Sequence, residues 1–215
     1  MSVIDRLLLR CGLIAGPLFI GGVLIQGVAR EDYSPLRHPV STLSLGPGGA
    51  VQIANFALTG GLSEGFVIGL TRTLGAQLGT RAGPVFLGAA AGGILGAAAF
   101  ATDPVSGYPP ETLDISTNTT VQGALHDLLT VPAFLCVPAA QLAFARAFMR
   151  HRDRGWAAYS VASALGMLIA YALATAGFHQ RQGLVPIAGA LQRAAIIIGS
   201  AWVTSLAARA LATAN

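Results

Sequence analysis

The sequence has few charged residues, no lysine and only two cysteines. Charged residues make up 10% of its 215 positions, and hydrophobic residues make up 53%; an average soluble domain is about a quarter charged. The mean hydropathy is +0.64. This balance excludes an ordinary soluble domain and indicates a protein that crosses a membrane several times. Because both cysteines lie in apolar runs, they predict neither a disulfide framework nor a metal site.

The sequence also lacks the signals of several common functions. The thirteen basic residues, all arginines, outnumber nine acidic residues, but they are not gathered in a polar domain, which argues against nucleic-acid binding. There is no glycine-rich phosphate loop, no nucleophile elbow and no HExxH motif. The sequence therefore predicts no cofactor.

Apolar runs long enough to cross a bilayer as helices divide the chain. There are six of them, at residues 11–28, 51–70, 83–101, 123–148, 156–178 and 184–208. The sequence predicts an all-α fold, a single six-helix transmembrane domain over residues 1–215.

The arginines predict how these helices are oriented. With six spans, nine arginines fall on the side of the termini: Arg6, Arg10, Arg72, Arg81, Arg146, Arg150, Arg152, Arg154 and Arg209. The opposite side has only Arg30, Arg37 and Arg181, with Arg193 a turn or two below it. Since cytoplasmic loops are enriched in arginine, we expect both termini in the cytoplasm.

Glycines recur at every fourth position in two of the predicted helices. They are Gly61, Gly65 and Gly69 in one helix and Gly88, Gly92 and Gly96 in the next. Such GxxxG stripes let helix backbones approach closely in lipid. We expect the two stripes to pack against each other, or against Gly12 and Gly16 of the first helix.

Polar residues collect on the predicted outer side, in the loops and in the outer turns of helices. The densest stretch is residues 33–44. Four of these polar residues, His126, Asp127, Gln192 and Arg193, lie within helix starts. An ionisable group at membrane depth costs at least about 2.5 kcal/mol unless it is paired or solvated. We therefore expect an outward-facing polar pocket, in which Arg193 pairs with Asp103 or Asp127.

Such a pocket suggests candidate roles. His126 is the candidate general acid or base, with Asp103 or Asp127 as a second catalytic group that fixes its tautomer. Arg37 or Arg193 would hold an anionic group such as a phosphate or carboxylate. The candidate binding residues are Tyr33, Arg37, His38, Ser41, His179, Gln192 and Arg193.

Two other interpretations of these residues remain open. Asp103, His126 and Arg193 could instead form an ion-paired lock that fastens the loops to the helix ends. A metal site would use His38, His126, His179 and Asp103, but these residues lack ligand-like spacing, so no metal is predicted.

Glu64 is an isolated acid in the inner half of the helix predicted at residues 51–70. It is either a packing residue or an intramembrane proton or ligand site.

Four segments together resemble a known family. They are residues 33–41 (YSPLRHPVS), residues 100–104 (FATDP) with Gly107 and Pro109, Gly123 with His126, and Gln192 with Arg193. In this order they resemble the bacterial six-helix family known as domain of unknown function 998, over nearly the whole chain. The resemblance implies an uncharacterised integral membrane protein, multi-pass in the bacterial plasma (inner) membrane, and transfers no activity.

The sequence thus favours a protein that binds a ligand in the outer pocket, or an accessory subunit with a membrane-protein partner or a second copy of itself. A first alternative is a membrane enzyme that acts on a lipid or isoprenoid-like substrate by acid-base chemistry. A second is a small-solute transporter, which would need a polar path from the pocket to Glu64.

Overall fold

The computed structural model describes residues 1–115 and 119–213, and over these residues it has six helices long and apolar enough to span a membrane. They are α1 (Val3–Ala29), α2 (Gly49–Leu70), α3 (Ala82–Ala99), α4 (Val121–Arg150), α5 (Arg154–Phe178) and α6 (Ala188–Ala212). The predicted all-α fold and its spans are confirmed. The largest difference between a predicted span and an observed helix is at the start of α1, which begins at Val3 and not at residue 11. The Ser2 hydroxyl caps this helix by accepting a hydrogen bond from the Asp5 N–H at 3.0 Å.

Three short elements complete the fold. The element η1 (Val40–Ser44) lies in the loop between α1 and α2. The element η2 (Thr71–Gly75) continues α2, and η3 (Val185–Ile187) leads into α6.

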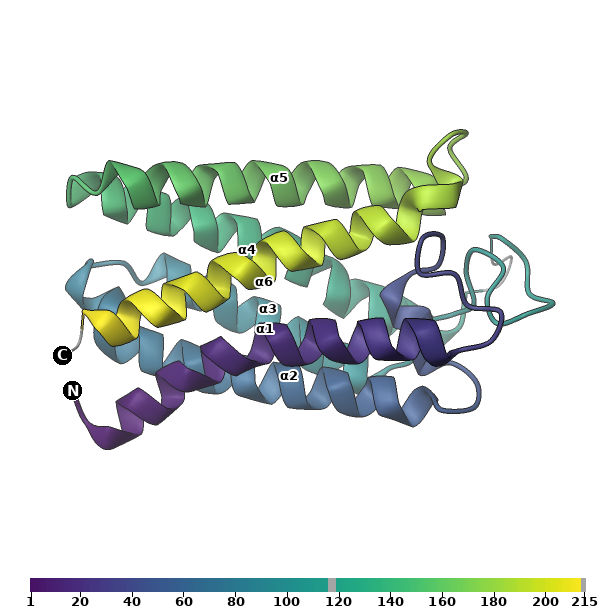
Figure 1. Cartoon of the computed structure of the whole chain (residues 1–215), viewed down its shortest axis with the longest axis horizontal. Coiled ribbons are helices and arrows are strands. Elements are labelled where there is room, and N and C mark those ends of the chain that lie inside the picture. The colour runs from purple at the N-terminus through teal and green to yellow at the C-terminus, as the bar shows by residue number, and fades with distance from the viewer. Residues whose placement is uncertain (116–118, 214–215) are drawn as a thin grey trace.

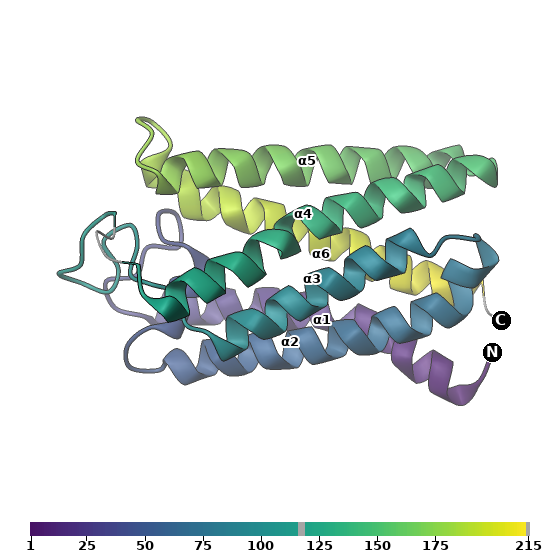
Figure 2. The same cartoon turned by 180° about the vertical axis from the view of Figure 1, so that it is seen from behind.

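The helices form a closed ring. Each of α1 to α5 packs on the next helix in the chain, and α6 returns to pack on α1. Both termini lie at one end of the ring, and the long loops lie at the other (Figures 1 and 2). These are called the termini end and the loop end below. The loop end corresponds to the predicted outer side.

The helix α4 runs obliquely within this ring. At the termini end it is joined to α5 by a tight turn, whereas at the loop end it lies beside α3 and away from α5 (Figures 1 and 2). Gly93 and Gly96 of α3 permit this close approach, because a Cβ on Gly96 would lie 2.7 Å from Leu129 of α4. Pro132 and Pro138 lie inside α4, and each removes one intrahelical hydrogen bond. The outer halves of α4 and α5 are thus separated.

The predicted packing of the glycine stripes is correct for the helices but not for a contact between the two stripes. The helix α2 packs on both α3 and α1, and its Gly65 and Gly69 face α1, where a Cβ on Gly69 would lie 2.9 Å from Leu8. On α3, Gly88 faces Val67 of α2 whereas Gly96 faces Leu129 of α4. A Cβ on Gly61 or Gly92 would meet no neighbouring atom within 4 Å. The glycines of a stripe are therefore divided between neighbouring helices and do not meet the other stripe.

The termini half of the ring is solidly packed. Its core includes the buried side chains Leu9, Phe66, Leu70, Phe144, Phe148, Trp202 and Leu206. At the edge of this core, Arg209 binds Asp153 at 2.8 Å and lies over the rings of Phe148 and Trp156 at 4.8 and 4.9 Å. The loop half of the ring has a smaller core, which includes Phe19, Tyr33, Leu43, Phe56 and Tyr108, and beside it lies a cavity.

Candidate functional site

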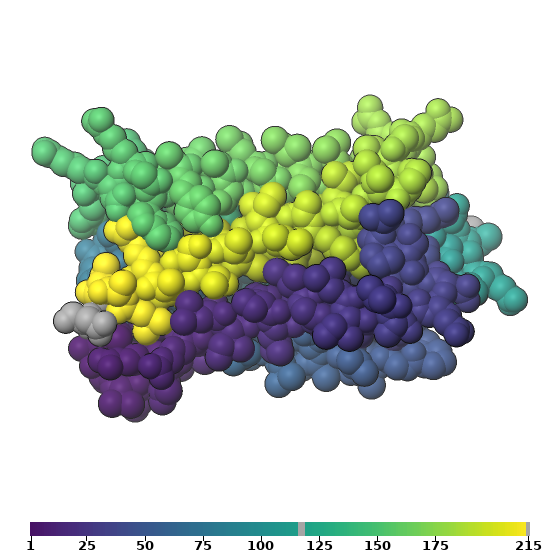
Figure 3. Space-filling model, viewed as in Figure 1, coloured from purple at the N-terminus to yellow at the C-terminus, as the bar shows by residue number. Residues whose placement is uncertain are grey.

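A cavity of about 500 Å³ lies inside the ring and is lined by residues from every helix from α1 to α6. Its wall is mostly apolar and includes Phe19, Phe56, Phe66, Leu87, Ile94, Phe134, Val137, Met167, Ile196 and Val203. On the face drawn in Figure 3, the side chains of α1, α6 and α5 meet without an opening. The volume lies within the range of about 300–1,000 Å³ typical of small-molecule sites.

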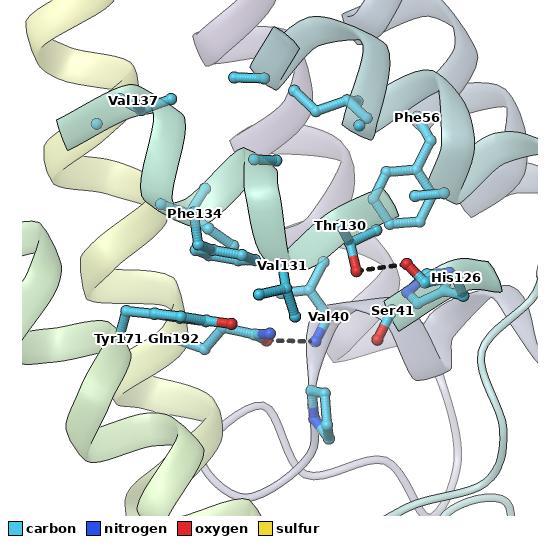
Figure 4. Close-up of a pocket in the computed structure, with 18 of the residues that line it drawn as sticks. Val40, Ser41, Phe56, His126, Thr130, Val131, Phe134, Val137, Tyr171 and Gln192 are labelled. Carbon is cyan, nitrogen blue, oxygen red and sulfur yellow. Dashed lines mark hydrogen bonds between the residues drawn. The ribbon is translucent and has the colours of Figure 1, made fainter. Parts of the chain in front are cut away.

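The charged and histidine residues of the lining all lie at the loop end of the cavity, and Figure 4 labels one of them, His126. They are Asp103, His126, Asp127 and His179. Ser41, Thr102, Thr119, Thr130, Thr175 and Gln192 line the cavity at the same end, whereas Thr59, Ser63 and Ser200 line it further along α2 and α6. A cavity with an apolar body and one polar end matches the shape of an amphiphilic molecule.

His126 is the most buried titratable residue of this polar end, with 3% of its surface exposed. Its Nδ1 lies 2.8 Å from the carbonyl oxygen of Phe100, at the end of α3. Since a carbonyl can only accept, Nδ1 is the donor, and the neutral ring presents Nε2 as an acceptor. The prediction that Asp103 or Asp127 fixes the tautomer is therefore wrong, because a backbone carbonyl does so.

Asp103 lines the cavity and also caps α4. Its carboxylate accepts bonds from the N–H of Thr120 at 2.9 Å and from the Thr120 hydroxyl at 2.7 Å. The same hydroxyl accepts a bond from the Gly123 N–H at 3.0 Å. A Cβ on Gly123 would clash with the Asp103 carboxylate. This arrangement holds Asp103 at the N-terminus of α4, where the helix dipole favours a negative charge.

Gln192 joins the cavity wall to the loop between α1 and α2. Its Oε1 accepts a bond from the Val40 N–H at 2.8 Å (Figure 4). Ser41, the next residue of the loop, also lines the cavity. Of the residues expected to meet in one pocket, Asp103, His126, Ser41 and Gln192 line this cavity, whereas Arg37 and Arg193 do not.

The exposed part of the cavity lining lies in two places at the loop end. One is between α4 and α5, where Asp127 and Val131 of α4 and His179 after α5 line the cavity and are exposed. We call this side the mouth, because α4 leaves α5 for α3 there. The other is the α3–α4 loop, where Ile115 and Thr119 also line the cavity and are exposed.

Four predicted binding residues lie outside the cavity lining. Tyr33, His38 and Arg193, together with Tyr108, form what we call the Tyr33 cluster. The rings of Tyr33, His38 and Tyr108 have centroids 5.1–5.3 Å apart. Nearby, Arg37 pairs with Asp114 at 2.6 Å. These side chains tie the α1–α2 loop to α6 and to the α3–α4 loop.

Arg193 is paired differently from the prediction. Its guanidinium donates to the carbonyl oxygens of Pro35, His38 and Gly189 at 2.6, 3.0 and 3.0 Å, and to the Tyr33 hydroxyl at 2.6 Å. It bonds neither Asp103 nor Asp127. The predicted ion pair is wrong. The α1–α2 loop folds back over α6, and its carbonyl oxygens occupy the guanidinium in place of a carboxylate.

Burial changes the titration of the Tyr33 cluster. It lowers the pKa of His38 below its ordinary value, and the positive charges of Arg37 and Arg193 lower that pKa further. Burial also raises the pKa of the Tyr33 hydroxyl, against the opposing effect of Arg193. His38 is thus neutral at pH 7, and its Nδ1 accepts a bond from the Ser34 N–H at 3.0 Å.

Glu64 lies in α2 and is half-buried, but it is not part of the cavity lining. Its carboxylate faces α3, with Oε2 3.9 Å from the position of a Cβ on Gly88. The neighbouring residues Ser63 and Val67 do line the cavity. The lining formed by the described residues therefore includes Thr59 and Ser63 of the same helix but not Glu64 itself.

Sequence reasoning missed the contribution of α5. Tyr171 and Thr175 line the cavity on the same helix face as His179. Their four-residue spacing within an otherwise apolar span was the available signal, because polar residues in a membrane helix face the interior of the bundle. Among residues 1–115 and 119–213, no three His, Cys, Asp or Glu side chains lie close enough to hold a metal ion.

A family model described as a protein of unknown function (DUF998) matches residues 13–209. No curated protein and no solved structure matches the chain.

Proposed function

This chain belongs to the DUF998 family of proteins of unknown function, and from that premise we propose that it is a membrane protein that binds an amphiphilic, lipid-like molecule. The apolar chain of the ligand occupies the cavity inside the helix ring, and its polar end lies against His126 and Asp127. The observation that carries this proposal is the cavity of about 500 Å³, with its mostly apolar wall and its charged and histidine residues at one end.

The packing of the ring supports this proposal. The termini half has a continuous core of large side chains, so the hollow in the loop half is a local property and not a general feature of the bundle. For a chain that comes from the bilayer, which is itself apolar, binding to such a wall is stabilised by van der Waals contacts rather than by removal from water. An alkyl or isoprenoid chain is therefore the kind of group that this wall accommodates.

The position of the mouth supports entry from the bilayer. Val131 is 42% exposed, lines the cavity, and lies on the part of α4 that has separated from α5. A lipid-like molecule can pass sideways through such an opening without leaving the membrane. This route fits an amphiphile better than a water-soluble ligand.

A blocked mouth tests the proposal. The protein and its Val131→Trp variant would be purified in a mild detergent, and the molecules that remain bound would be identified by native mass spectrometry. We expect a bound amphiphile on the unmodified protein and its loss from Val131→Trp.

The matched control is Leu135→Trp, one turn further along α4. Leu135 is 50% exposed and is outside the cavity lining, so this variant should keep the ligand. Equal retention by the unmodified protein and by Val131→Trp would contradict the proposal. An unmodified protein that carries no amphiphile and takes none up from added lipid extract would also contradict it.

An enzyme acting on the same class of molecule is the second candidate. The observation that favours it is the unprotonated Nε2 of His126, which belongs to a cavity-lining ring near the Asp127 carboxylate. An imidazole nitrogen so placed can accept a proton from a bound hydroxyl. If the chain is an enzyme, His126→Gln, which keeps a hydrogen-bond acceptor but cannot act as a base, should fold and should change the lipid profile of cells. An unchanged profile would leave binding as the function.

The orientation in the membrane follows from the arginines. Nine arginines belong to the termini end and three or four to the loop end, so we place the termini in the cytoplasm and the loop end outside, in the bacterial plasma membrane. A membrane-impermeant thiol reagent should label Leu113→Cys on intact cells but not His151→Cys, with Cys11 and Cys136 replaced by serine. The reverse pattern would overturn this orientation.

A further inference from the structure

The hydrogen-bonding groups at the polar end of the cavity are biased toward acceptors. His126 is buried, with 3% of its surface exposed. Its Nδ1–H donates to the Phe100 carbonyl oxygen, and its Nε2 is an acceptor. No described residue donates a bond to this Nε2. This nitrogen is not itself fully enclosed, so it can accept a hydrogen bond from a ligand atom in the cavity.

The second histidine at this end has the same arrangement. The Nδ1 of His179 lies 2.9 Å from the carbonyl oxygen of Thr175. The nitrogen must donate to this carbonyl, so in the neutral ring Nε2 is the acceptor. Two imidazoles, one on α4 and one just after α5, thus offer acceptors on the cavity lining in their neutral forms.

The charges of the lining are negative. Asp103 and Asp127 both line the cavity, and no arginine does so among the described residues. The nearby arginines are already engaged, because Arg37 pairs with Asp114 and Arg193 donates to backbone carbonyls and Tyr33. Asp127 forms no ion pair with any described residue. The expected anionic head group, held by Arg37 or Arg193, is therefore not what this lining would recognise.

We propose that the cavity selects an amphiphile whose polar end is cationic, such as a protonated amine, and that Asp127 is the residue that determines this specificity. This inference rests on the proposed function, since it concerns the ligand of the same cavity. The amine donates hydrogen bonds to His126 Nε2 and to the Asp127 carboxylate, while the alkyl chain lies along the apolar wall. An anionic head group would be repelled by the carboxylates of Asp103 and Asp127 and by the lone pair on His126 Nε2.

Three ligands with the same chain test the charge preference. The protein, in nanodiscs of zwitterionic phosphatidylcholine, would be equilibrated with dodecylamine, dodecanol or dodecanoate, and the bound fraction would be measured by native mass spectrometry. We expect dodecylamine to half-saturate the protein at a concentration at least about tenfold lower than dodecanoate, a difference that corresponds to about 1.4 kcal/mol. Dodecanol should fall between them.

A matched pair of variants assigns the preference to one residue. Asp127→Asn should weaken dodecylamine binding about tenfold and leave dodecanol binding nearly unchanged. Glu111→Gln removes an acid of the loop end that does not line the cavity, and it should change neither. Because Asp127 is exposed, its replacement by asparagine should not prevent folding, which thermal unfolding would verify.

The outcomes separate this inference from the proposed function. If the three ligands bind equally well, or if dodecanoate binds best, the cavity binds amphiphiles but the charge preference is overturned. If none of them binds and Val131→Trp changes nothing, the proposed function fails as well. If Asp127→Asn and Glu111→Gln weaken amine binding equally, the preference comes from the general surface charge and the role of Asp127 is overturned.

Discussion

The aromatic rings of Phe134 in α4 and Tyr171 in α5 stack face to face, with centroids 4.3 Å apart and planes 5° apart. Both residues line the cavity. The stack lies about two helical turns from Asp127 along α4 and from His179 along α5, and these two residues mark the mouth. The stack therefore joins the two helices directly below the point where they separate.

A double-mutant cycle should detect this contact. We expect Phe134→Ala and Tyr171→Ala to be coupled by about 1 kcal/mol in the free energy of unfolding, the value typical of aromatic pairs. Unfolding in mixed micelles of a mild detergent and SDS would measure it. Phe134→Ala combined with Leu173→Ala serves as the control, because Leu173 is exposed on α5 and lies outside the lining. A coupling near zero for the aromatic pair would show that the stack does not hold the helices together.

Asp103 should matter for stability through its cap on α4. Asp103→Asn keeps one acceptor but loses the charge at the helix N-terminus, so it should lower the free energy of unfolding by about 1 kcal/mol. Gly123→Ala should lower it further, since a Cβ there meets the carboxylate. The same unfolding assay would compare both variants with Glu111→Gln, for which no loss is expected. If Asp103→Asn and Gly123→Ala unfold like the unmodified protein, the cap contributes nothing.

Arg193 should not be replaceable by lysine. The planar guanidinium donates to three carbonyls and one hydroxyl at once, and a lysine ammonium cannot reproduce that geometry. Because each buried carbonyl left without a donor costs about 1–3 kcal/mol, Arg193→Lys should lower the free energy of unfolding by about 2 kcal/mol or more. Limited proteolysis should also cleave the α1–α2 loop faster. The control is Arg181→Lys at an exposed position, and equal behaviour of the two variants would contradict the prediction.

The pH dependence of stability should report on His38. Its pKa in the folded protein is lower than the ordinary histidine value of 6.5, so the unfolded chain takes up a proton first as the pH falls. The stabilisation is complete above about pH 6.5 and is lost progressively below it. Thermal unfolding at pH 7.5 and pH 5 would measure the loss.

The variant His38→Asn isolates this effect. Asparagine offers an oxygen in place of Nδ1 to the Ser34 N–H but does not titrate near neutrality. The loss of stability between pH 7.5 and pH 5 should be smaller in His38→Asn than in the unmodified protein. In the control His151→Asn, at an exposed position of the termini end, the loss should be unchanged. An equal pH dependence in all three proteins would assign it to other groups.

Two functions considered from the sequence stay predictions. A role as an accessory subunit requires a partner or a second copy, and copurification in a mild detergent would test it. A role in transport requires a polar path across the membrane, and the cavity lining, as far as it is described, does not include Glu64.

The sequence by itself determined the helices, because long apolar runs can satisfy their backbone hydrogen bonds in lipid only as helices. It also indicated which end would be polar, and it identified Asp103, His126 and Asp127, all of which line the cavity. It could not determine which side chains meet, since a contact such as Arg193 with the Pro35 carbonyl depends on how a loop folds back over a helix 158 positions away. The cavity depended on tertiary structure for the same reason. It lies where α4 crosses from α5 to α3, and although Pro132 and Pro138 are visible in the sequence, the direction that α4 takes depends on its packing partner, Gly96 of α3 against Leu129.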